Sequence, residues 1–282
     1  MANVCVITGG GSGMGLEAAR NIPKDVKLVL TGRTVSKLEH AKEILEAEGH
    51  EVYLTACDVS IRRDVHELCL FAGSLGTIKT VIHAAGLSPT MGDAEKIIMV
   101  NAVGTKNVNM EFYKYMNDGG VIVDVASSSA YQAPGLLVKP QIFEEAEYQE
   151  DKFIKHMTGE AMLPPGEEND PGLAYVLSKK FVVWYAQKCA HEYAKKGIRV
   201  VSVSPGLIET DMGTREAAAW DYTKEMIENT CEQRMGTAAE MGFTIAMIAD
   251  ERNGYLRGID VLVDGGASTG KQFKKNKDVL KF

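Results

Sequence analysis

The stretch Asn3-Val-Cys-Val-Ile-Thr-Gly-Gly-Gly-Ser-Gly-Met-Gly15 joins a short run rich in β-branched residues to a cluster of glycines, and a helical stretch follows from Leu16 to Asn21. A strand that breaks into a glycine turn and then a helix is the context in which such a motif indicates dinucleotide binding. Glycine permits positive φ and lets backbone amides approach a pyrophosphate, which rests on the positive end of the helix. The alternative is a glycine loop that is merely flexible. The pattern favours a dinucleotide site.

Further short apolar runs alternate with helical stretches along the rest of the chain. Strands alternating with helices of about 10 to 20 residues predict a parallel sheet that is covered on both faces, with a ligand crevice at the carboxyl ends of the strands. We therefore expect one α/β domain spanning residues 1–282. The later strands are expected at 27–31, 51–57, 79–83, 121–126, 198–204 and 259–263.

The composition excludes several classes of protein. The 282 residues carry a net charge of -7, which argues against nucleic-acid binding, because that affinity comes mainly from neutralised phosphates. No apolar run reaches the ~18 residues of a membrane span, and the first residues lead directly into a strand without a cleavable signal. We therefore expect neither a nucleic-acid nor a membrane partner.

The cysteines and histidines indicate neither a disulfide framework nor a metal centre. The five cysteines, at positions 5, 57, 69, 189 and 231, are odd in number and unclustered, which fits reduced thiols in the cytoplasm. The six histidines form no His-Glu-x-x-His motif, and no Cys-x-x-Cys accompanies them. We expect no metal.

A second motif, Tyr175-Val-Leu-Ser-Lys179, places a phenol and an ammonium four residues apart in a long apolar-rich segment. On a helix these positions share one face, so both polar tips can point into the same cleft. Bringing a phenol from a pKa of about 10 to roughly 7 takes about 4 kcal/mol of preferential stabilisation of the phenolate, which a fixed cation in a dry site can supply. The alternative is a chance pair on a helix surface.

Together these motifs resemble the short-chain dehydrogenase/reductase family. The resemblance rests on the Thr-Gly-x-x-x-Gly-x-Gly spacing that starts at Thr8, the Tyr/Lys pair, Pro205-Gly206 and Asp264-Gly-Gly266, and it spans roughly residues 3 to 270. It implies a Rossmann-type, doubly wound, mostly parallel seven-stranded sheet with helices on both faces. It also implies a nicotinamide cofactor, a small alcohol or ketone substrate and a homodimer or homotetramer.

The cofactor residues follow from the resemblance, with a preference for NADP. Arg33 stands where an acidic residue would hold the ribose 2'-hydroxyl of NAD, and a guanidinium suits a 2'-phosphate. Ser12 occupies a place where NADP-using members often carry a second basic residue, so NAD remains an alternative cofactor. Arg33 could instead be a solvated charge in the loop. Asp58 is expected to bond the adenine amino group or to cap the next helix. The expected cofactor residues are Gly9, Ser12, Gly13, Met14, Arg33, Asp58, Val59, Ala84, Ala85, Gly86, Tyr175, Lys179, Pro205, Gly206, Ile208 and Thr210.

Four residues carry the chemistry that the resemblance implies. Tyr175 would move the hydroxyl proton, and Lys179 would stabilise its phenolate and bind the nicotinamide ribose. Ser127 would hold the substrate oxygen, with Ser128 or Ser129 as alternatives if the strand end slips. Asn101 would bend its helix and hold a water that relays protons, unless it is satisfied locally.

The sequence departs from the family pattern at two strands and at one insertion. His83-Ala84 replaces the usual asparagine pair, and Asp124 replaces another asparagine. A helical insertion at about 132–172, with apolar residues near helical spacing, is similar to the 3α-hydroxysteroid dehydrogenase/carbonyl reductase branch and suggests a lid or a subunit contact. That branch implies a hydroxysteroid or bile-acid-like substrate. The expected helical apolar residues are Ile142, Phe143, Ala146, Phe153, Ile154 and Met157.

Several smaller features complete the sequence predictions. Two capping boxes, at 36–39 and 237–240, predict helix starts. Met212, Trp220, Tyr222 and Met226 would cover the substrate or belong to the core, and the lysine-rich tail at 271–282 is expected to be solvated. Two other functions remain open: a sugar-nucleotide epimerase or dehydratase with bound NAD, and a non-enzymatic nucleotide sensor.

Overall fold

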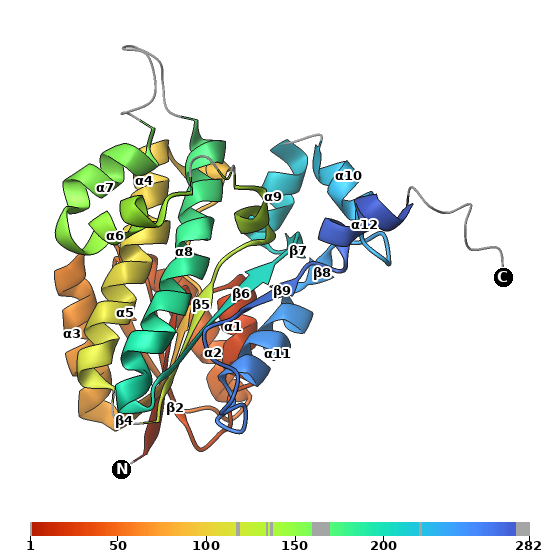
Figure 1. Cartoon of the computed structure of the whole chain (residues 1–282). Coiled ribbons are helices and arrows are strands. Elements are labelled where there is room, and N and C mark those ends of the chain that lie inside the picture. The colour runs from red at the N-terminus through yellow and green to blue at the C-terminus, as the bar shows by residue number, and fades with distance from the viewer. Residues whose placement is uncertain are drawn as a thin grey trace.

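Seven strands that are rich in β-branched residues form one parallel sheet in the order β3-β2-β1-β4-β5-β6-β9 (Figure 1). The computed structural model describes residues 2–116, 119–133, 135, 138–159, 170–219 and 222–274. The strand order and the parallel pairing confirm the predicted Rossmann-type sheet. The strands are β1 (Asn3–Thr8), β2 (Lys27–Gly32), β3 (Val52–Ala56), β4 (Thr77–His83), β5 (Val121–Val125), β6 (Arg199–Pro205) and β9 (Asp260–Val263).

Helices cover both faces of this sheet, so the strands are apolar on both sides (Figure 1). In β1, Val4 and Val6 pack into one core and Cys5 and Ile7 into the other. This two-sided burial explains why the strands are nearly continuous apolar runs. One face carries α1 (Gly13–Arg20), α2 (Val35–Ala47) and α11 (Ala238–Ala249), and the other carries α3 (Arg62–Leu75), α5 (Gly104–Tyr115) and α8 (Pro171–Tyr193).

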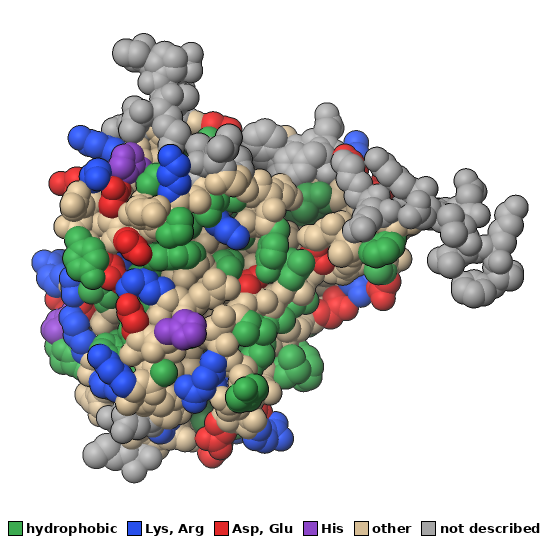
Figure 2. Space-filling model, in the orientation of Figure 1, with side chains coloured by type: hydrophobic (Ala, Val, Ile, Leu, Met, Phe, Trp, Pro, Cys, Tyr) green, Lys and Arg blue, Asp and Glu red, His purple; other side chains and the backbone are tan. Residues whose placement is uncertain are grey.

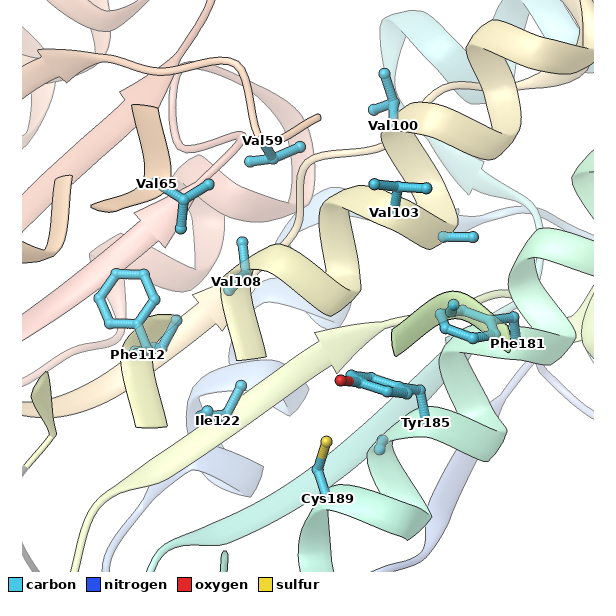
Figure 3. Packing of buried hydrophobic residues seen from close by; sticks show 14 of the residues in the cluster. Val59, Val65, Val100, Val103, Val108, Phe112, Ile122, Phe181, Tyr185 and Cys189 are labelled. Atoms are coloured by element: carbon cyan, nitrogen blue, oxygen red, sulfur yellow. The ribbon is translucent and has the colours of Figure 1, made fainter. Parts of the chain in front are cut away.

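Figure 3 shows part of the core on the α3/α5/α8 face, and this core has more buried residues than the one on the other face. Phe112 of α5, Ile122 of β5 and Tyr185 of α8 meet there without exposure to solvent. Because Tyr185 and the motif Tyr175-Lys179 lie on the same helix, this packing fixes the position of α8 against the sheet.

The remaining elements follow strand ends or connect the larger helices. The short strands β7 and β8 form a separate parallel pair that the sequence did not predict. These elements are Pro89–Met91, α4 (Ala94–Ile98), a π-helical turn (Met99–Val103), Ser128–Gln132, Ala194–Lys196, β7 (Ile208–Glu209), α9 (Asp211–Ala219), α10 (Tyr222–Asn229), β8 (Gly236–Thr237) and α12 (Ala267–Lys274).

The predicted insertion contains two helices, α6 (Pro140–Tyr148) and α7 (Glu150–Met157), with a break at Gln149. Phe143 and Phe153 are fully buried against Phe181 of α8. Residues 140–157 are thus largely helical and pack on α8 beside the sheet, and their being an insertion relative to the family stays a prediction. Parts of the insertion, 134, 136–137 and 160–169, lie outside the described residues, as does most of the tail, 275–282.

Of the two predicted capping boxes, one is confirmed and one is wrong. Thr237 and Glu240 exchange the expected side-chain to backbone bonds at the start of α11. Helix α2 begins at Val35, so Ser36 already lies inside the first turn and Thr34 holds the cap position, without a side-chain cap bond. A capping residue needs a non-helical backbone conformation for its side chain to accept from the second or third helical amide, and Ser36 is already helical.

A chain of buried hydrogen bonds runs through His83 at the end of β4. Thr105 donates its hydroxyl to the Asn101 carbonyl at 2.6 Å, so it accepts from Nε2 of His83 at 3.1 Å. Nδ1 of His83 then accepts from Thr8 at 2.8 Å. Burial lowers the pKa of His83 to about 3, which keeps the imidazole neutral and holds β1, β4 and α5 together.

Asp124 is a second buried polar group, at zero exposure beneath α5 and α8. Asn109 donates to both of its carboxyl oxygens at 3.0 Å. Burial raises the pKa of Asp124 to about 7, although Asn109 and the Lys179 ammonium oppose this rise. The carboxyl therefore changes its charge near neutral pH inside the core.

No helix among the described residues is long and apolar enough to span a membrane. The five cysteines are free, and all but Cys231 are buried. On the face shown in Figure 2, basic and acidic side chains are intermixed without a broad basic area.

Asp124→Asn should flatten the pH dependence of stability. Because the folded-state pKa is raised, the penalty for burying the carboxylate is absent below about pH 4 and is complete above about pH 7. Wild-type stability should therefore fall across that window. The substitution should raise the free energy of unfolding at pH 8 by roughly 2 to 4 kcal/mol and change it little at pH 4. Urea unfolding at both pH values measures this, with the exposed Asp25→Asn as a control that should behave like wild type. Equal gains at both pH values would show that ionisation of Asp124 is not the cause.

Candidate active site

A cavity of about 480 Å³ follows the glycine turn along the carboxyl ends of the strands. Most of the residues predicted to bind the cofactor line it, although they come from distant parts of the sequence. This is the crevice in which doubly wound sheets hold nucleotides. The predicted residues on its wall are Gly9, Ser12, Gly13, Met14, Arg33, Asp58, Val59, Ala84, Ala85, Gly86 and Thr210.

The glycine turn is packed so closely that side chains would not fit. Gly9 has a φ of 67°, and a Cβ there would lie 2.9 Å from the Ala84 carbonyl. A Cβ at Gly15 would lie 2.5 Å from the Gly9 oxygen. Ser12 precedes α1 without a side-chain cap bond, so the first amides of α1 keep their capacity to bind an anion. The turn therefore fits a pyrophosphate.

Three basic side chains line this cavity, two of them from the segment that follows β2. Arg33 is exposed at the wall, and Lys37 of α2 and Arg215 of α9 line the same cavity. Lys37 Nζ lies 3.8 Å from Asp211 Oδ2. Sequence reasoning missed Lys37 and Arg215. The position of Lys37 in the first helical turn after Arg33 could have indicated that it lies near the cofactor site. No local pattern places Arg215 there, because only the tertiary fold brings α9 to this cavity.

Asp58 does not cap the next helix as predicted, because Ile61 holds the N-cap position of α3 without a side-chain cap bond. Oδ1 of Asp58 accepts from the amide and the hydroxyl of Ser60 at 3.0 and 2.6 Å, in the turn before α3. The residue also lines the cavity together with Val59. Its carboxylate is thus held by a local turn at the wall of the cavity.

The phenol and the ammonium of the second motif lie one turn apart on α8 and are both buried, at 9% and 6% exposure. Lys179 Nζ lies 5.8 Å from the centroid of the Tyr175 ring and donates to the Val125 carbonyl at 3.0 Å. Burial lowers the pKa of Lys179 to about 8, while the carboxylates of Glu216 and Asp124 oppose this. The amine is therefore mainly charged at neutral pH.

A second cavity, of about 270 Å³, brings Tyr175 together with the serines that follow β5. Ser127, Ser128 and Ser129 all line it, and Ser127 Oγ accepts from the Ser129 amide at 3.2 Å. The cavity thus contains the predicted serine and both alternatives. Gly206, which was predicted to bind the cofactor, also lines this cavity.

Asn101 lies in the π-helical turn and is fully satisfied by its surroundings. Its Oδ1 accepts from the Leu87 amide at 2.8 Å, and its Nδ2 donates to the Leu87 carbonyl and to Ser178 Oγ at 3.0 and 3.2 Å. A Cβ at Gly86 would lie 3.3 Å from Asn101 Oδ1 and 3.4 Å from Lys179 Nζ. Asn101 therefore sits near Lys179 and holds the backbone at Leu87. Its role as a proton relay stays a prediction.

The other predicted residues have mixed placements. Pro205 ends β6 and Ile208 begins β7, and neither lines the cavity along the glycine turn. Met212 lines that first cavity and Met226 the second, so of these two methionines Met226 is the one placed to cover a substrate beside Tyr175. Trp220 and the side chain of Tyr222 lie outside what the structure describes.

The residues of the first cavity fit a nicotinamide dinucleotide better than a metal. The glycine turn admits a pyrophosphate, and cations stand at the end where the ribose of such a cofactor would lie. Within the described ranges, no group of three His, Cys, Asp or Glu side chains is placed to hold a metal ion.

Comparisons with known proteins agree with this geometry. A family model described as short chain dehydrogenase matches residues 3–138, and one described as Enoyl-(Acyl carrier protein) reductase matches residues 166–268. Short-chain dehydrogenase/reductase bsc3 of Alternaria brassicicola is 27% identical over 95% of this chain and 96% of its own length. An uncharacterized oxidoreductase of Staphylococcus saprophyticus is 30% identical over 74% of this chain and 80% of its own length.

Solved structures share the fold at lower identity. A short chain dehydrogenase from Burkholderia cenocepacia in complex with NADP has 18% identity and a TM-score of 0.72 over 94% of this chain and 97% of that one. With its parallel sheet, its glycine turn and its relatives, the chain belongs to the short-chain dehydrogenase/reductase family of oxidoreductases.

Proposed function

We propose that the protein is an NAD(P)-dependent oxidoreductase that interconverts a secondary alcohol and its ketone. The observation that supports this most is the placement of Tyr175. Its phenol lies at a cavity shared with Ser127 and has the buried Lys179 ammonium one helical turn away. Proton exchange with an alcohol requires a general acid or base, and a fixed cation beside a phenol makes the phenol a stronger acid.

The bound nicotinamide would supply the hydride chemistry, and the side chains would supply the rest. Tyr175 would exchange a proton with the substrate oxygen, and Ser127 would hold that oxygen by a hydrogen bond. Lys179 would stabilise the phenolate and hold the nicotinamide ribose. Asn101 would hold the backbone at Leu87 beside Lys179.

NADP is the proposed cofactor, with NAD as the alternative. Arg33 and Lys37 stand near the end of β2, and a planar guanidinium can pair with a phosphate in two parallel bonds. Lys37 offers the second base that Ser12 does not provide.

The substrate class is open within this proposal. The resemblance of the helical insertion to the 3α-hydroxysteroid dehydrogenase/carbonyl reductase branch suggests a hydroxysteroid or bile-acid-like alcohol. Val176, Leu207 and Met226 give the second cavity an apolar wall.

Oxidation of a panel of steroids, bile acids, sugars and simple secondary alcohols with NAD or NADP, followed at the nicotinamide absorbance band, tests function and cofactor together. Failure of the whole panel would favour the nucleotide sensor, and copurified, non-exchanging NAD would favour the epimerase. A cytoplasmic homodimer or homotetramer stays a prediction.

Tyr175→Phe should reduce turnover at least about a hundredfold while leaving cofactor affinity nearly unchanged, because it removes only the hydroxyl that exchanges the proton. Initial rates on the best alcohol of the panel and fluorescence titration with NADPH measure the two quantities. Tyr193→Phe, which removes a phenol farther along the same helix, should keep its turnover. A Tyr175→Phe enzyme as active as wild type would rule out the proposed acid.

Arg33→Ala should weaken NADP binding about ten- to hundredfold and change NAD binding little, because the lost charged hydrogen bonds involve only the 2'-phosphate. The ratio of the two dissociation constants measures this preference. Arg252→Ala, an exposed arginine beyond α11, should leave the ratio unchanged. An equal loss of affinity for NADP and NAD would mean that Arg33 does not bind the 2'-phosphate.

A further inference from the structure

The cavity that contains Ser127 and Tyr175 also contains a carboxylate that the proposed reaction does not use. Glu216 comes from α9, the helix that runs between the two cavities, so that Arg215 lines the first cavity and Glu216 lines the second. One turn of α9 thus presents a cation to the proposed cofactor and an anion to the proposed substrate.

Glu216 is half-buried, and within the described part of the chain it accepts no hydrogen bond. Burial raises its pKa, and the Lys179 ammonium opposes this rise. A carboxylate withdrawn from water without a full set of donors is unfavourable, and the binding of a donor relieves the penalty. The side chain is therefore suited to accept a hydrogen bond from something that enters the cavity.

The other charged residue on the described wall of this cavity is also acidic. Asp170 lies at the N-terminus of α8 and also lines the cavity, with Oδ1 accepting from the Gly172 amide at 2.8 Å. Among the described residues that line this cavity there is no lysine or arginine. A carboxylate or phosphate on the substrate would meet two anions, whereas a hydroxyl or ammonium would find acceptors.

We propose that Glu216 is a specificity-determining residue that selects alcohols and ketones carrying a hydrogen-bond donor, a hydroxyl or a protonated amine, close to the reacting carbon. This inference rests on the proposed function, because it takes the cavity at Tyr175 as the substrate site. The cavity volume of about 270 Å³ lies just below the range of about 300 to 1,000 Å³ for small-molecule sites, which favours a compact alcohol over a hydroxysteroid or bile-acid-like one.

Selection would come from repulsion as well as attraction. A donor that pairs with Glu216 makes a charged hydrogen bond, while an ether of the same size leaves the carboxylate unpaired and an acid repels it. Loss of this hydrogen bond corresponds to an affinity or kcat/KM about ten- to hundredfold lower between otherwise equal substrates.

A matched series of cyclohexanols tests this. The compounds are trans-1,2-cyclohexanediol, trans-2-aminocyclohexanol, trans-2-methoxycyclohexanol and trans-2-hydroxycyclohexanecarboxylate. Each has a secondary ring alcohol beside the varied group, and values for the diol are taken per hydroxyl because it has two. Calorimetric titration into the NADPH-loaded protein, which cannot oxidise the alcohol, gives affinity, and NADPH formation from NADP gives kcat/KM. The wild type should prefer the diol and the amine over the ether by about tenfold or more, with the acid weakest.

Two variants separate charge from hydrogen bonding. Glu216→Gln keeps an acceptor and loses the charge, so the preference for the amine should fall more than the preference for the diol. Glu216→Ala should lose both preferences. Glu228→Gln, which makes the same change on α10 at an exposed position outside the cavity, should keep the wild-type ratios.

The outcomes distinguish this inference from the proposed function. Equal or stronger binding of the ether, no binding of any compound, or ratios that survive both Glu216 variants would overturn the inference. Selective binding that depends on Glu216, without NADPH or NADH formation from any compound, would leave the recognition role standing and count against the alcohol dehydrogenase itself.

Discussion

The buried ammonium of Lys179 is the interaction on which the rest of the site depends. It has lost most of its water, and a carbonyl at the end of β5 holds it in place. Burial alone would favour the neutral amine, but the carboxylates of Glu216 and Asp124 help to keep it charged. A cation fixed in this way, one helical turn from Tyr175, gives the phenol a neighbour that favours its ionised form.

The sheet supplies the two cavities because its strands end at one edge. The glycine turn after β1 forms the wall for a dinucleotide, and the serines after β5 form the wall for a substrate. Helix α8 places Tyr175 at the second cavity, and α9 contributes to both. Buried polar groups, above all the neutral His83 between Thr8 and Thr105, tie the strands and α5 together behind them.

The sequence predicted what depends on local pattern. β-branched runs gave the strands within a few residues, and the placement of Tyr175, Ser127 and the glycine turn at neighbouring cavities followed from parallel strands ending at one edge. Features set by tertiary contacts were missed. Glu216 reaches the cavity only because α9 folds over the strand ends, and the short pair β7 and β8 carries too few residues for a pattern. The capping box at 36–39 failed because α2 starts one residue before it.

The most direct test of the central claim compares the pH dependence of alcohol oxidation in the wild type and in Lys179→Met. If the ammonium stabilises the Tyr175 phenolate, the pH at which kcat/KM reaches half its maximum should rise in the variant by at least about one unit. Rates taken at saturating cofactor, with the affinity of each protein measured by titration, would separate this effect from a loss of ribose binding. The same midpoint in both proteins would contradict the account.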